Sequence, residues 1–192
     1  MPAIVNHNAR RHEIAQAVGR IVASQGLQAV TIRATAKEVG FSTTLITHYF
    51  DNKEALMSFS YLAARNRTTA RIERAIKRDR DLLSIFSECL PTTKRRRSDW
   101  MLWFGLWGVA IDDKVLQEER IRGYQEAQVL FAQVLRWAQK KGEVGAEIDC
   151  DYQAIRIMAF INGLASLAAQ ASAKWPRKSL ENMLDLELKA LS

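Results

Sequence analysis

The segment Thr31–Leu56, which reads TIRATAKEVGFSTTLITHYFDNKEAL, constrains the fold of this chain more than any other part of the sequence. Its first threonine can cap a helix that ends at Val39, and Gly40 can close that helix in the left-handed conformation that glycine adopts without strain. Ser42 can then cap a second short helix over Thr43–Phe50. We therefore predict two short helices joined by a glycine-centred turn.

The rest of the sequence is also helical in pattern. Only three prolines occur in the chain, and two of them fall where a helix is expected to stop or start. Apolar residues recur at helical spacing, and no alternating strand pattern or internal repeat competes. Further helices are expected at about 14–25, 52–78, 81–90, 100–111, 113–141, 149–173 and 176–191.

This pattern predicts an all-α fold of about nine helices. A three-helix helix-turn-helix domain is expected over residues 1–52, and a larger helical bundle over residues 53–192. The division follows from the start of the long helix near Asn52, which leaves the two short helices and the first helix as one compact unit.

Composition narrows the class of protein. Hydrophobic residues make up 48% of the 192 residues and charged residues 26%, which is ordinary for a soluble globular chain. No apolar run approaches the roughly 20 residues that span a bilayer, and the N-terminus lacks the apolar core of a secretory signal. The two cysteines, Cys89 and Cys150, fit neither a zinc site nor a redox pair. We expect a cytoplasmic protein with no membrane partner, no metal and no cofactor.

Catalytic constellations are missing from the sequence. The three histidines, His7, His12 and His48, all fall within the first 48 residues. No Ser/His/Asp or Cys/His arrangement, glycine-rich phosphate loop or metal-ligand spacing occurs. We therefore do not expect an enzyme.

Charge is distributed unevenly along this chain of net charge +7. Residues 1–97 contain 17 Lys and Arg against 8 Asp and Glu, whereas residues 98–192 contain 11 against 13. Nucleic acid attracts positive charge irrespective of base sequence, so the asymmetry favours a nucleic-acid contact in the first half. A solvated basic surface explains the same counts, and charge alone does not separate the two explanations.

One face of the second short helix carries short polar side chains at helical spacing: Thr43, Thr44, Thr47 and His48. Hydroxyls and an imidazole can reach base edges, the thymine methyl group or phosphate oxygens in a major groove. Lys53, at the start of the next helix, is placed to meet a phosphate, and Arg33 to flank the same groove. The alternative is that these hydroxyls are solvated and that threonine merely fills a short helix.

The segment resembles the DNA-binding domain of TetR-type transcriptional regulators over about residues 9–56. The matching residues are Gly26, Thr31-Ile32-Arg33, Ala36, Val39-Gly40, Ser42, Tyr49-Phe50 and Lys53-Glu54-Ala55-Leu56. The resemblance implies that the helix from Thr43 enters the major groove of DNA. It assigns DNA contact to Thr43, Thr44, Thr47, His48 and Tyr49, flanking roles to Arg33 and Lys53, and capping near the DNA backbone to Thr31.

Two residues depart from the pattern of that family. A small residue is common at the position of Thr44, and an aromatic residue at the position of Thr47. Threonine has a shorter reach than tyrosine and adds a hydrogen-bond acceptor near the bases. We expect the operator to differ from that of close relatives.

A group of aromatic residues characterises the second half of the chain. Trp100, Trp103 and Trp107 recur at i, i+3 and i+7, which places three indoles on one helix face. Phe104 lies alongside them, and the next helix adds Tyr124. An aromatic stripe at this spacing is commonly part of a core. The alternative is a pocket wall, whose aromatic faces suit a quaternary ammonium or a planar aromatic compound.

From Asp99 to Ala169 the chain also resembles the C-terminal domain of the BetI-like branch of the family. The matching features are Asp99-Trp100, Leu102-Trp103, Leu106-Trp107, Lys140-Lys141-Gly142-Glu143 and Ile161-Asn162-Gly163-Leu164. The resemblance implies a small-molecule effector in this domain, with Trp100, Trp103, Phe104, Trp107 and Tyr124 as candidate ligand-binding residues. Choline fits an aromatic cage and is one candidate, because members of this branch differ widely in effector.

Several charged residues of this half receive no assigned role. Asp112, Asp113, Glu118 and Glu119 can offer a carboxylate to a cation, although a solvated helix start explains them equally well. Arginines at helical spacing on one face of the long helix are expected to be mostly solvated: Arg67, Arg71, Arg74 and Arg78. We predict that the run Lys94–Arg97 lies in an exposed loop.

The last two helices carry more apolar residues than one buried face needs, which is typical of a surface that meets a partner. The resemblance implies a homodimer formed through these helices. The candidate interface residues are Phe160, Ile161, Leu164, Leu167, Leu184 and Leu188. A two-fold dimer sets its recognition helices about one turn of DNA apart, near 34 Å, and so predicts a palindromic operator.

We therefore expect a dimeric, sequence-specific DNA-binding regulator. It is most simply a repressor that a small-molecule effector releases from double-stranded DNA, and the direction of regulation comes from the resemblance alone. The alternative is a sequence-independent DNA-binding module whose C-terminal domain serves only as a dimer scaffold. The affinity for a selected palindrome relative to random duplex, at fixed salt, separates these two functions.

Overall fold

A computed structural model describes residues 7–109 and 114–191 of the chain, and every regular element within those ranges is helical. The nine α-helices are α1 (His7–Gln25), α2 (Ile32–Val39), α3 (Thr43–Tyr49), α4 (Lys53–Lys77), α5 (Leu82–Ser87), α6 (Lys94–Val109), α7 (Lys114–Lys140), α8 (Cys150–Gln170) and α9 (Arg177–Lys189). Two short 3-10 helices, η1 (Leu27–Ala29) and η2 (Ser172–Lys174), complete the set. The prediction of an all-α fold of about nine helices is confirmed.

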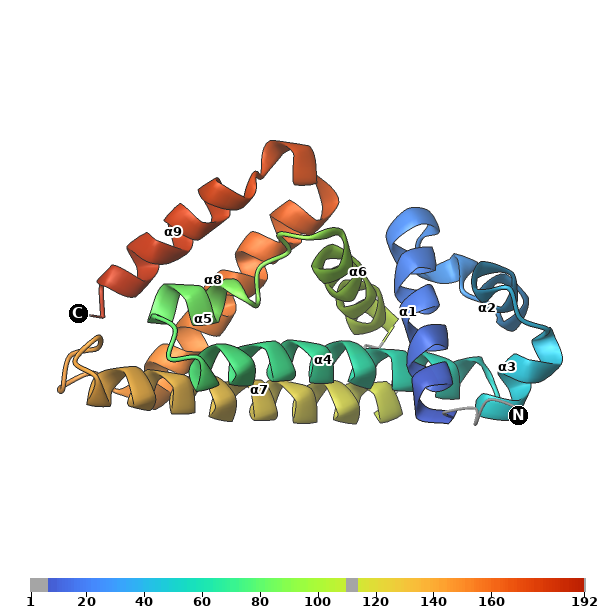
Figure 1. Ribbon diagram of the computed structural model, residues 1–192, viewed down its shortest axis with the longest axis horizontal. Helices are drawn as coiled ribbons and strands as arrows, with labels where there is room; N and C mark the ends of the chain where they lie inside the picture. Colours follow the sequence, from blue (N-terminus) through green and yellow to red (C-terminus); the bar gives the residue numbers. More distant parts are fainter. Residues whose placement is uncertain (1–6, 110–113, 192) are drawn as a thin grey trace.

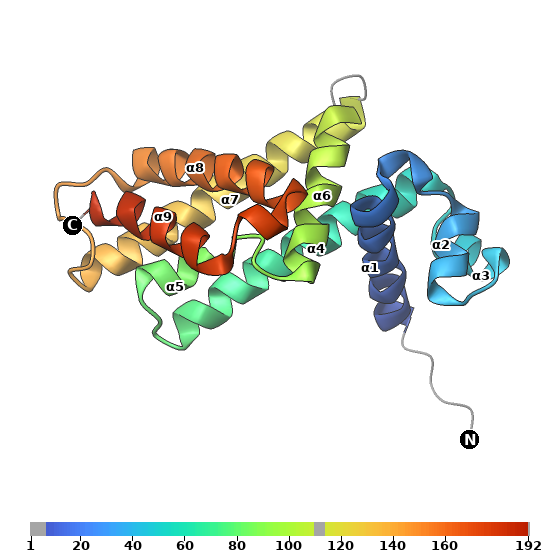
Figure 2. The same cartoon turned by 90° about the horizontal axis from the view of Figure 1, so that it is seen from above.

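The helices form two groups that share α4 (Figure 1). Helices α1, α2 and α3 gather around the N-terminal end of α4, and α5, α7, α8 and α9 lie toward its other end. Helix α6 lies between the groups and packs against α1 on one side and α8 on the other (Figure 2). Both α4 and α6 therefore belong to the N-terminal group and to the C-terminal bundle.

The helix starts in the N-terminal group form as the sequence predicts. Thr31 Oγ1 accepts a hydrogen bond from the Ala34 amide at 3.0 Å and caps α2. Ser42 Oγ caps α3 in the same way, at 3.1 Å from the Leu45 amide nitrogen. Gly40 ends α2 with a φ of 71°, a conformation that would strain any residue with a Cβ. These local contacts fix the angle between the two short helices.

The core of the N-terminal group extends beyond the first 52 residues. Ile14 and Val18 of α1 and Ile46 of α3 are completely buried and pack with residues of α4. Leu102 and Leu106 of α6, which are 0% and 4% exposed, belong to the same cluster. Burying apolar side chains is the main stabilising contribution in such a core. The position of α1 thus depends directly on the position of α6.

The arginines of α4 are less solvated than the sequence predicts. Arg67 pairs with Asp99 of α6, and Arg71 Nη1 lies 3.8 Å from the other carboxylate oxygen of Asp99. The side chains of both arginines are 16% exposed, and Asp99 is 2% exposed as a whole residue. A buried carboxylate needs such partners because burial penalises its charge. Arg74 and Arg78, one and two turns further on, are exposed as predicted.

Residues 94–97 form the first turn of α6, and the prediction of an exposed loop there is wrong. Thr93 Oγ1 accepts a hydrogen bond from the Arg96 amide at 3.2 Å and so caps the helix. The Arg96 guanidinium donates to the Ser87 carbonyl at 3.1 Å and pairs with Glu88. Cations are disfavoured at a helix N-terminus, and Glu88 offsets this cost for Arg96.

Candidate functional site

Helix α3 presents its predicted groove face to the surface. The four residues of that face are all exposed: Thr43, Thr44, Thr47 and His48. On the opposite face Ile46 is completely buried, and Phe50, which follows the helix, is 3% exposed. A short helix that is anchored on one side and polar on the other can enter a major groove without losing core contacts.

The predicted flanking residues lie at the two ends of the same surface. Thr31 and Arg33, at the start of α2, are exposed, and Lys53, at the start of α4, is half-buried. Tyr49 is half-buried at the end of α3, with its ring 5.4 Å from the His48 ring. All eight predicted DNA-contact residues therefore lie on α3 or at the start of α2 or α4, and none of them is fully buried.

His7 is a neighbour of this surface that sequence reasoning missed. Its ring centroid lies 5.7 Å from that of Tyr49 and 6.3 Å from that of His48. It opens α1, so nothing in its local sequence connects it with α3. Only the packing of α1 against the helix-turn-helix places this imidazole beside the recognition helix.

The hydroxyl of Thr47 is partly committed to its own helix. Thr47 Oγ1 lies 3.1 Å from the Thr44 carbonyl oxygen and 3.3 Å from that of Thr43, and it donates to these carbonyls. A hydroxyl that donates its proton still has lone pairs that accept. Thr47 can therefore accept a hydrogen bond from a base or turn its methyl group toward thymine.

The C-terminal bundle contains an aromatic cavity of about 320 Å³ between α4, α6, α7 and α8. Most of its lining is apolar, with Ile72 from α4, Leu130 and Phe131 from α7, and Met158 and Ile161 from α8. A mostly apolar cavity of this size with a few polar groups is typical of a small-molecule site. The aromatic wall comes from the residues predicted for a ligand: Trp100, Trp103, Trp107 and Tyr124.

The tryptophans meet edge to face along α6. The ring centroids of Trp100 and Trp103 lie 4.8 Å apart at 78°, an arrangement that aromatic pairs favour. Trp100 Nε1 donates to the Cys89 carbonyl at 2.7 Å, which fixes its ring. Phe104 stacks on Trp100 at 5.3 Å, but it does not line the cavity. Its contact with a ligand therefore stays a prediction.

The polar side of the cavity comes from α4 and α7, and no local sequence pattern predicts it. Arg65, Thr68 and Thr69 line it from α4, and Arg120 and Glu126 from α7. Arg65 Nη2 pairs with Glu126 at 3.1 Å, while Arg65 Nη1 and the indole nitrogen of Trp103 are buried without a hydrogen-bond partner. Both donors belong to residues that line the cavity.

Tyr61 closes the cavity on the side of the N-terminal group. Burial raises the pKa of its phenol, although the nearby Trp107, Arg65 and Arg120 oppose that shift. The phenol therefore stays protonated at neutral pH and is available as a donor or acceptor. Tyr61 also belongs to the hydrophobic core of the N-terminal group, so one side chain is shared by the cavity wall and that core.

Of the carboxylates considered for a cation, the described ones, Glu118 and Glu119, do not line this cavity. Glu118 is exposed, and the Glu119 side chain pairs with Arg122 at 3.3 Å. Asp112 and Asp113 lie outside the described residues. Glu126, the carboxylate that does line the cavity, already has an arginine partner.

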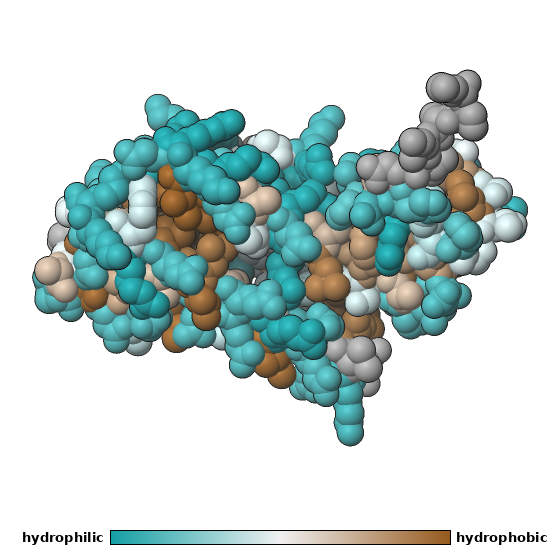
Figure 3. Space-filling view, turned by 60° about the horizontal axis from the view of Figure 1, so that its bottom comes forward, coloured by the Kyte–Doolittle hydropathy of each residue, from teal (hydrophilic) through white to brown (hydrophobic). Residues whose placement is uncertain are grey.

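The predicted interface residues divide into buried and exposed sets. Four of them pack inside the chain and offer a partner little surface: Ile161, Leu164, Leu184 and Leu188. Phe160 is half-buried, and Leu167 is 52% exposed. Other large apolar side chains of α8 and α9 are exposed, namely Tyr152, Ile155, Met183 and Leu186. On the face turned forward in Figure 3 the surface is largely hydrophilic, with apolar residues confined to a few patches.

Among residues 7–109 and 114–191, no group of three or more His, Cys, Asp or Glu side chains is arranged to hold a metal ion. Within the same described part of the chain, no helix has both the length and the apolar character needed to cross a bilayer.

Comparison with known proteins places both halves of the chain in one class. Residues 14–58 match the bacterial regulatory proteins of the tetR family, and residues 77–192 match the C-terminal domain of BetI-type transcriptional repressors. The chain is 26% identical over 169 residues to the HTH-type transcriptional regulator PksA of Bacillus subtilis, covering 86% of this chain and 81% of that protein.

Solved structures share the fold along nearly the whole chain. A transcriptional regulator from Rhodococcus has a TM-score of 0.80 at 23% identity and covers 94% of this chain and 95% of its own. A transcriptional regulator from Saccharomonospora viridis in complex with choline has a TM-score of 0.73 at 23% identity, covering 93% and 94%.

The helix-turn-helix and the bundle behind it define a DNA-binding transcription regulator. The chain belongs to the TetR family, and its C-terminal domain is of the BetI type.

Proposed function

We propose that this protein is a dimeric repressor that binds a palindromic operator and leaves it when a small molecule occupies the aromatic cavity. The observation that carries the proposal is the double role of α6. Trp100, Trp103 and Trp107 of this helix line the cavity, whereas Leu102 and Leu106 are buried in the core that holds the recognition helix. A ligand that shifts α6 therefore also shifts the helix-turn-helix.

Helix α4 supports the same coupling. It begins at Lys53, next to the recognition helix, and its next turns supply Tyr61, Arg65 and Ile72 to the cavity. Packed helices tend to move as rigid bodies, so a small tilt near the cavity changes the position of α3. A ligand that binds the tilted state more tightly than the DNA-binding state lowers the affinity for DNA. The size of the effect is set by the ratio of the ligand's affinities for the two states.

The polar groups of the cavity favour an apolar effector that carries a hydrogen-bond acceptor or a carboxylate. Arg65 and Arg120 bring two positive charges to the lining, and Glu126 brings one negative charge that Arg65 already uses. The unpartnered Arg65 Nη1 and Trp103 Nε1 are donors, and a buried donor gains from an acceptor on the ligand. A quaternary ammonium would meet the aromatic faces but also the repulsion of two guanidiniums.

The dimer is proposed to form through the exposed apolar residues of α8 and α9. Leu186 is 70% exposed and Tyr152 58% exposed, with Leu167 and Ile155 on the same two helices. Burying such side chains against a second copy of the chain would stabilise a dimer. A two-fold dimer would place its two α3 helices about 34 Å apart, so that they could enter successive major grooves.

Two measurements test the proposal in sequence. Selection of bound sequences from random duplexes identifies the operator, and a palindrome is expected. Tryptophan fluorescence of the α6 cluster is then titrated with apolar carboxylates, neutral aromatic compounds and quaternary ammonium compounds. The proposal requires that a compound with saturable binding also lowers operator affinity. Saturable binding that leaves operator affinity unchanged would defeat it.

A further inference from the structure

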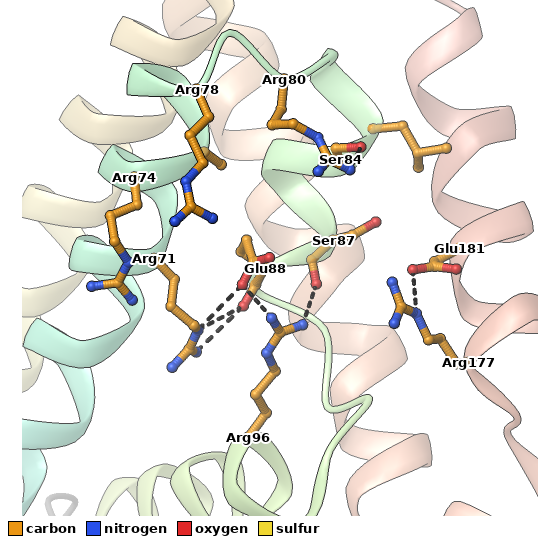
Figure 4. A pocket seen from close by; sticks show the side chains of 12 residues that line it. Arg71, Arg74, Arg78, Arg80, Ser84, Ser87, Glu88, Arg96, Arg177 and Glu181 are labelled. Atoms are coloured by element: carbon orange, nitrogen blue, oxygen red, sulfur yellow. Dashed lines mark hydrogen bonds and ion pairs between the residues drawn. The ribbon is translucent and has the colours of Figure 1, made fainter.

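A second hollow, of about 450 Å³, lies between α4, α5, α9 and the start of α6, apart from the aromatic cavity. Six arginines from separate parts of the chain line it: Arg71, Arg74, Arg78, Arg80, Arg96 and Arg177 (Figure 4). The lining carboxylates are Glu88 and Glu181. We call this hollow the arginine groove.

Two of these arginines form the inner wall of the groove. Arg71 and Arg96 both reach Glu88, and their side chains are 16% and 17% exposed. Arg71 Nη2 also donates to Thr68 Oγ1 at 2.9 Å and to the Glu88 carbonyl at 3.3 Å. Burial, followed by the neighbouring charge of Arg96, lowers the pKa of Arg71. Two guanidiniums are therefore held close together around one carboxylate.

The outer arginines have fewer partners. Arg74, Arg78 and Arg80 form no ion pair with a carboxylate in the described part of the chain, and the Arg80 guanidinium donates to the Ser84 hydroxyl at 3.2 Å. Arg177 faces them from α9 and pairs with Glu181 at 2.7 Å (Figure 4). The groove therefore keeps an excess of positive charge that the chain does not neutralise.

We propose that the arginine groove binds a small, multiply charged anion, with phosphoryl groups as the chemistry it recognises. Guanidinium forks bind phosphoryl oxygens in pairs of parallel hydrogen bonds, and several forks around one hollow match several such groups. The volume exceeds that of a single phosphate ion and lies in the range of sites for small organic ligands. The proposal is independent of the aromatic cavity.

DNA is a poorer match for the groove than a small anion. Arg74 follows Lys53 on α4 by nearly six helical turns, which corresponds to roughly 30 Å along the helix. The groove also lies at the end of α4 remote from α3 (Figure 1). A phosphate backbone bound at α3 therefore does not reach it, and a second ligand is required to use its charge.

The test is a calorimetric titration of the full chain with inorganic tripolyphosphate at fixed salt. The test variant is Arg74→Gln with Arg78→Gln, which removes two exposed charges that no ion pair uses. The matched control is Lys77→Gln with Arg95→Gln. It also removes two exposed positive charges, one from α4 and one from α6, but neither residue lines the groove. Thermal unfolding with and without tripolyphosphate provides a second readout, because a ligand of the folded state raises Tm.

The proposal predicts saturable one-to-one binding and a raised Tm for wild type and control. It also predicts at least about tenfold weaker binding for the test variant, whose operator affinity stays within about twofold of wild type. Equal weakening in both variants would mean that the overall positive charge of the surface, and not the groove, holds the anion, and it would overturn the proposal. So would the absence of saturable binding, or a loss of operator affinity confined to the test variant, which would make the groove a DNA contact.

Discussion

Leu102 and Trp103 are consecutive on α6 and both pack with the N-terminal core, but only Trp103 also lines the aromatic cavity. Leu102 is completely buried in the core formed with α1, α3 and α4, whereas Trp103 lines the aromatic cavity. Consecutive helical residues point about 100° apart, so one helix can serve two cores. This relationship joins the cavity through α6 to α1, which packs against the helix-turn-helix.

Truncation of Leu102 should destabilise the protein strongly. Leu102→Ala removes a buried side chain from the N-terminal core, and such changes typically cost roughly 2–5 kcal/mol of unfolding free energy. Urea denaturation measures the loss. Val109→Ala on the same helix is the control, because Val109 is 40% exposed and should change stability by no more than about 0.5 kcal/mol. Similar losses in both variants would mean that α6 is not anchored through Leu102.

Gly123 offers a way to disturb the cavity without touching the aromatic wall. A Cβ at Gly123 would lie 2.8 Å from Arg65 Nη1 and 2.9 Å from the Tyr61 hydroxyl, so Gly123→Ala should push these side chains into the cavity. We expect weaker effector binding with operator affinity preserved. Gly108→Ala is the control, since a Cβ there meets no atom within 4 Å. Effector binding unchanged in Gly123→Ala would place the ligand elsewhere.

The buried Asp99 should matter more than an exposed ion pair. Asp99→Asn leaves Arg67 and Arg71 without their shared carboxylate, and breaking such a buried pair costs roughly 3–5 kcal/mol. Asp151→Asn removes an exposed partner of Arg136, which lies 2.8 Å away, and should cost far less, because solvent screens an exposed ion pair. Equilibrium unfolding in urea compares the two variants, and equal costs would contradict the structural role of Asp99.

The thiol of Cys89 should make stability depend on pH in alkali. Burial raises its pKa from 9.0 to about 12. The folded chain therefore keeps a proton that the unfolded chain releases above about pH 9, and this stabilisation is lost as pH rises from 9 toward 12. Between pH 8 and pH 10.5 the unfolding free energy should fall more steeply in the wild type than in Cys89→Ala. Parallel pH profiles would show that the buried thiol does not contribute.

Two residues of the DNA surface should differ in the kind of affinity they provide. His48→Ala should weaken binding to the operator more than binding to random duplex, because a side chain on the groove face can contact bases. Lys53→Ala should weaken both and reduce the slope of log affinity against log salt by about one. Equal loss of specificity from the two changes would show that these roles are misassigned.

The sequence predicts those parts of the fold that depend on local contacts. Thr31, Ser42 and Gly40 define the ends of the two short helices, and the spacing of the α6 tryptophans places three indoles on one face. These features need only the residues beside them, so their chemistry can be read from a single stretch of the chain.

The remaining features depend on residues that are distant in the sequence. Arg65 meets Glu126 across 61 positions only because α4 and α7 lie side by side, and Arg96 meets Glu88 because Thr93 begins a helix. The apolar excess of the last helices is partly used within the chain, where Leu184 and Leu188 join the core around α5 and α8. No local pattern distinguishes such a core residue from an interface residue.

The most direct measurement of the central claim is the affinity of the full chain for its selected palindrome and for random duplex of the same length, at one salt concentration. A sequence-specific regulator should bind the palindrome at least about a thousandfold more tightly. A ratio near one would contradict the account and leave a sequence-independent DNA-binding module.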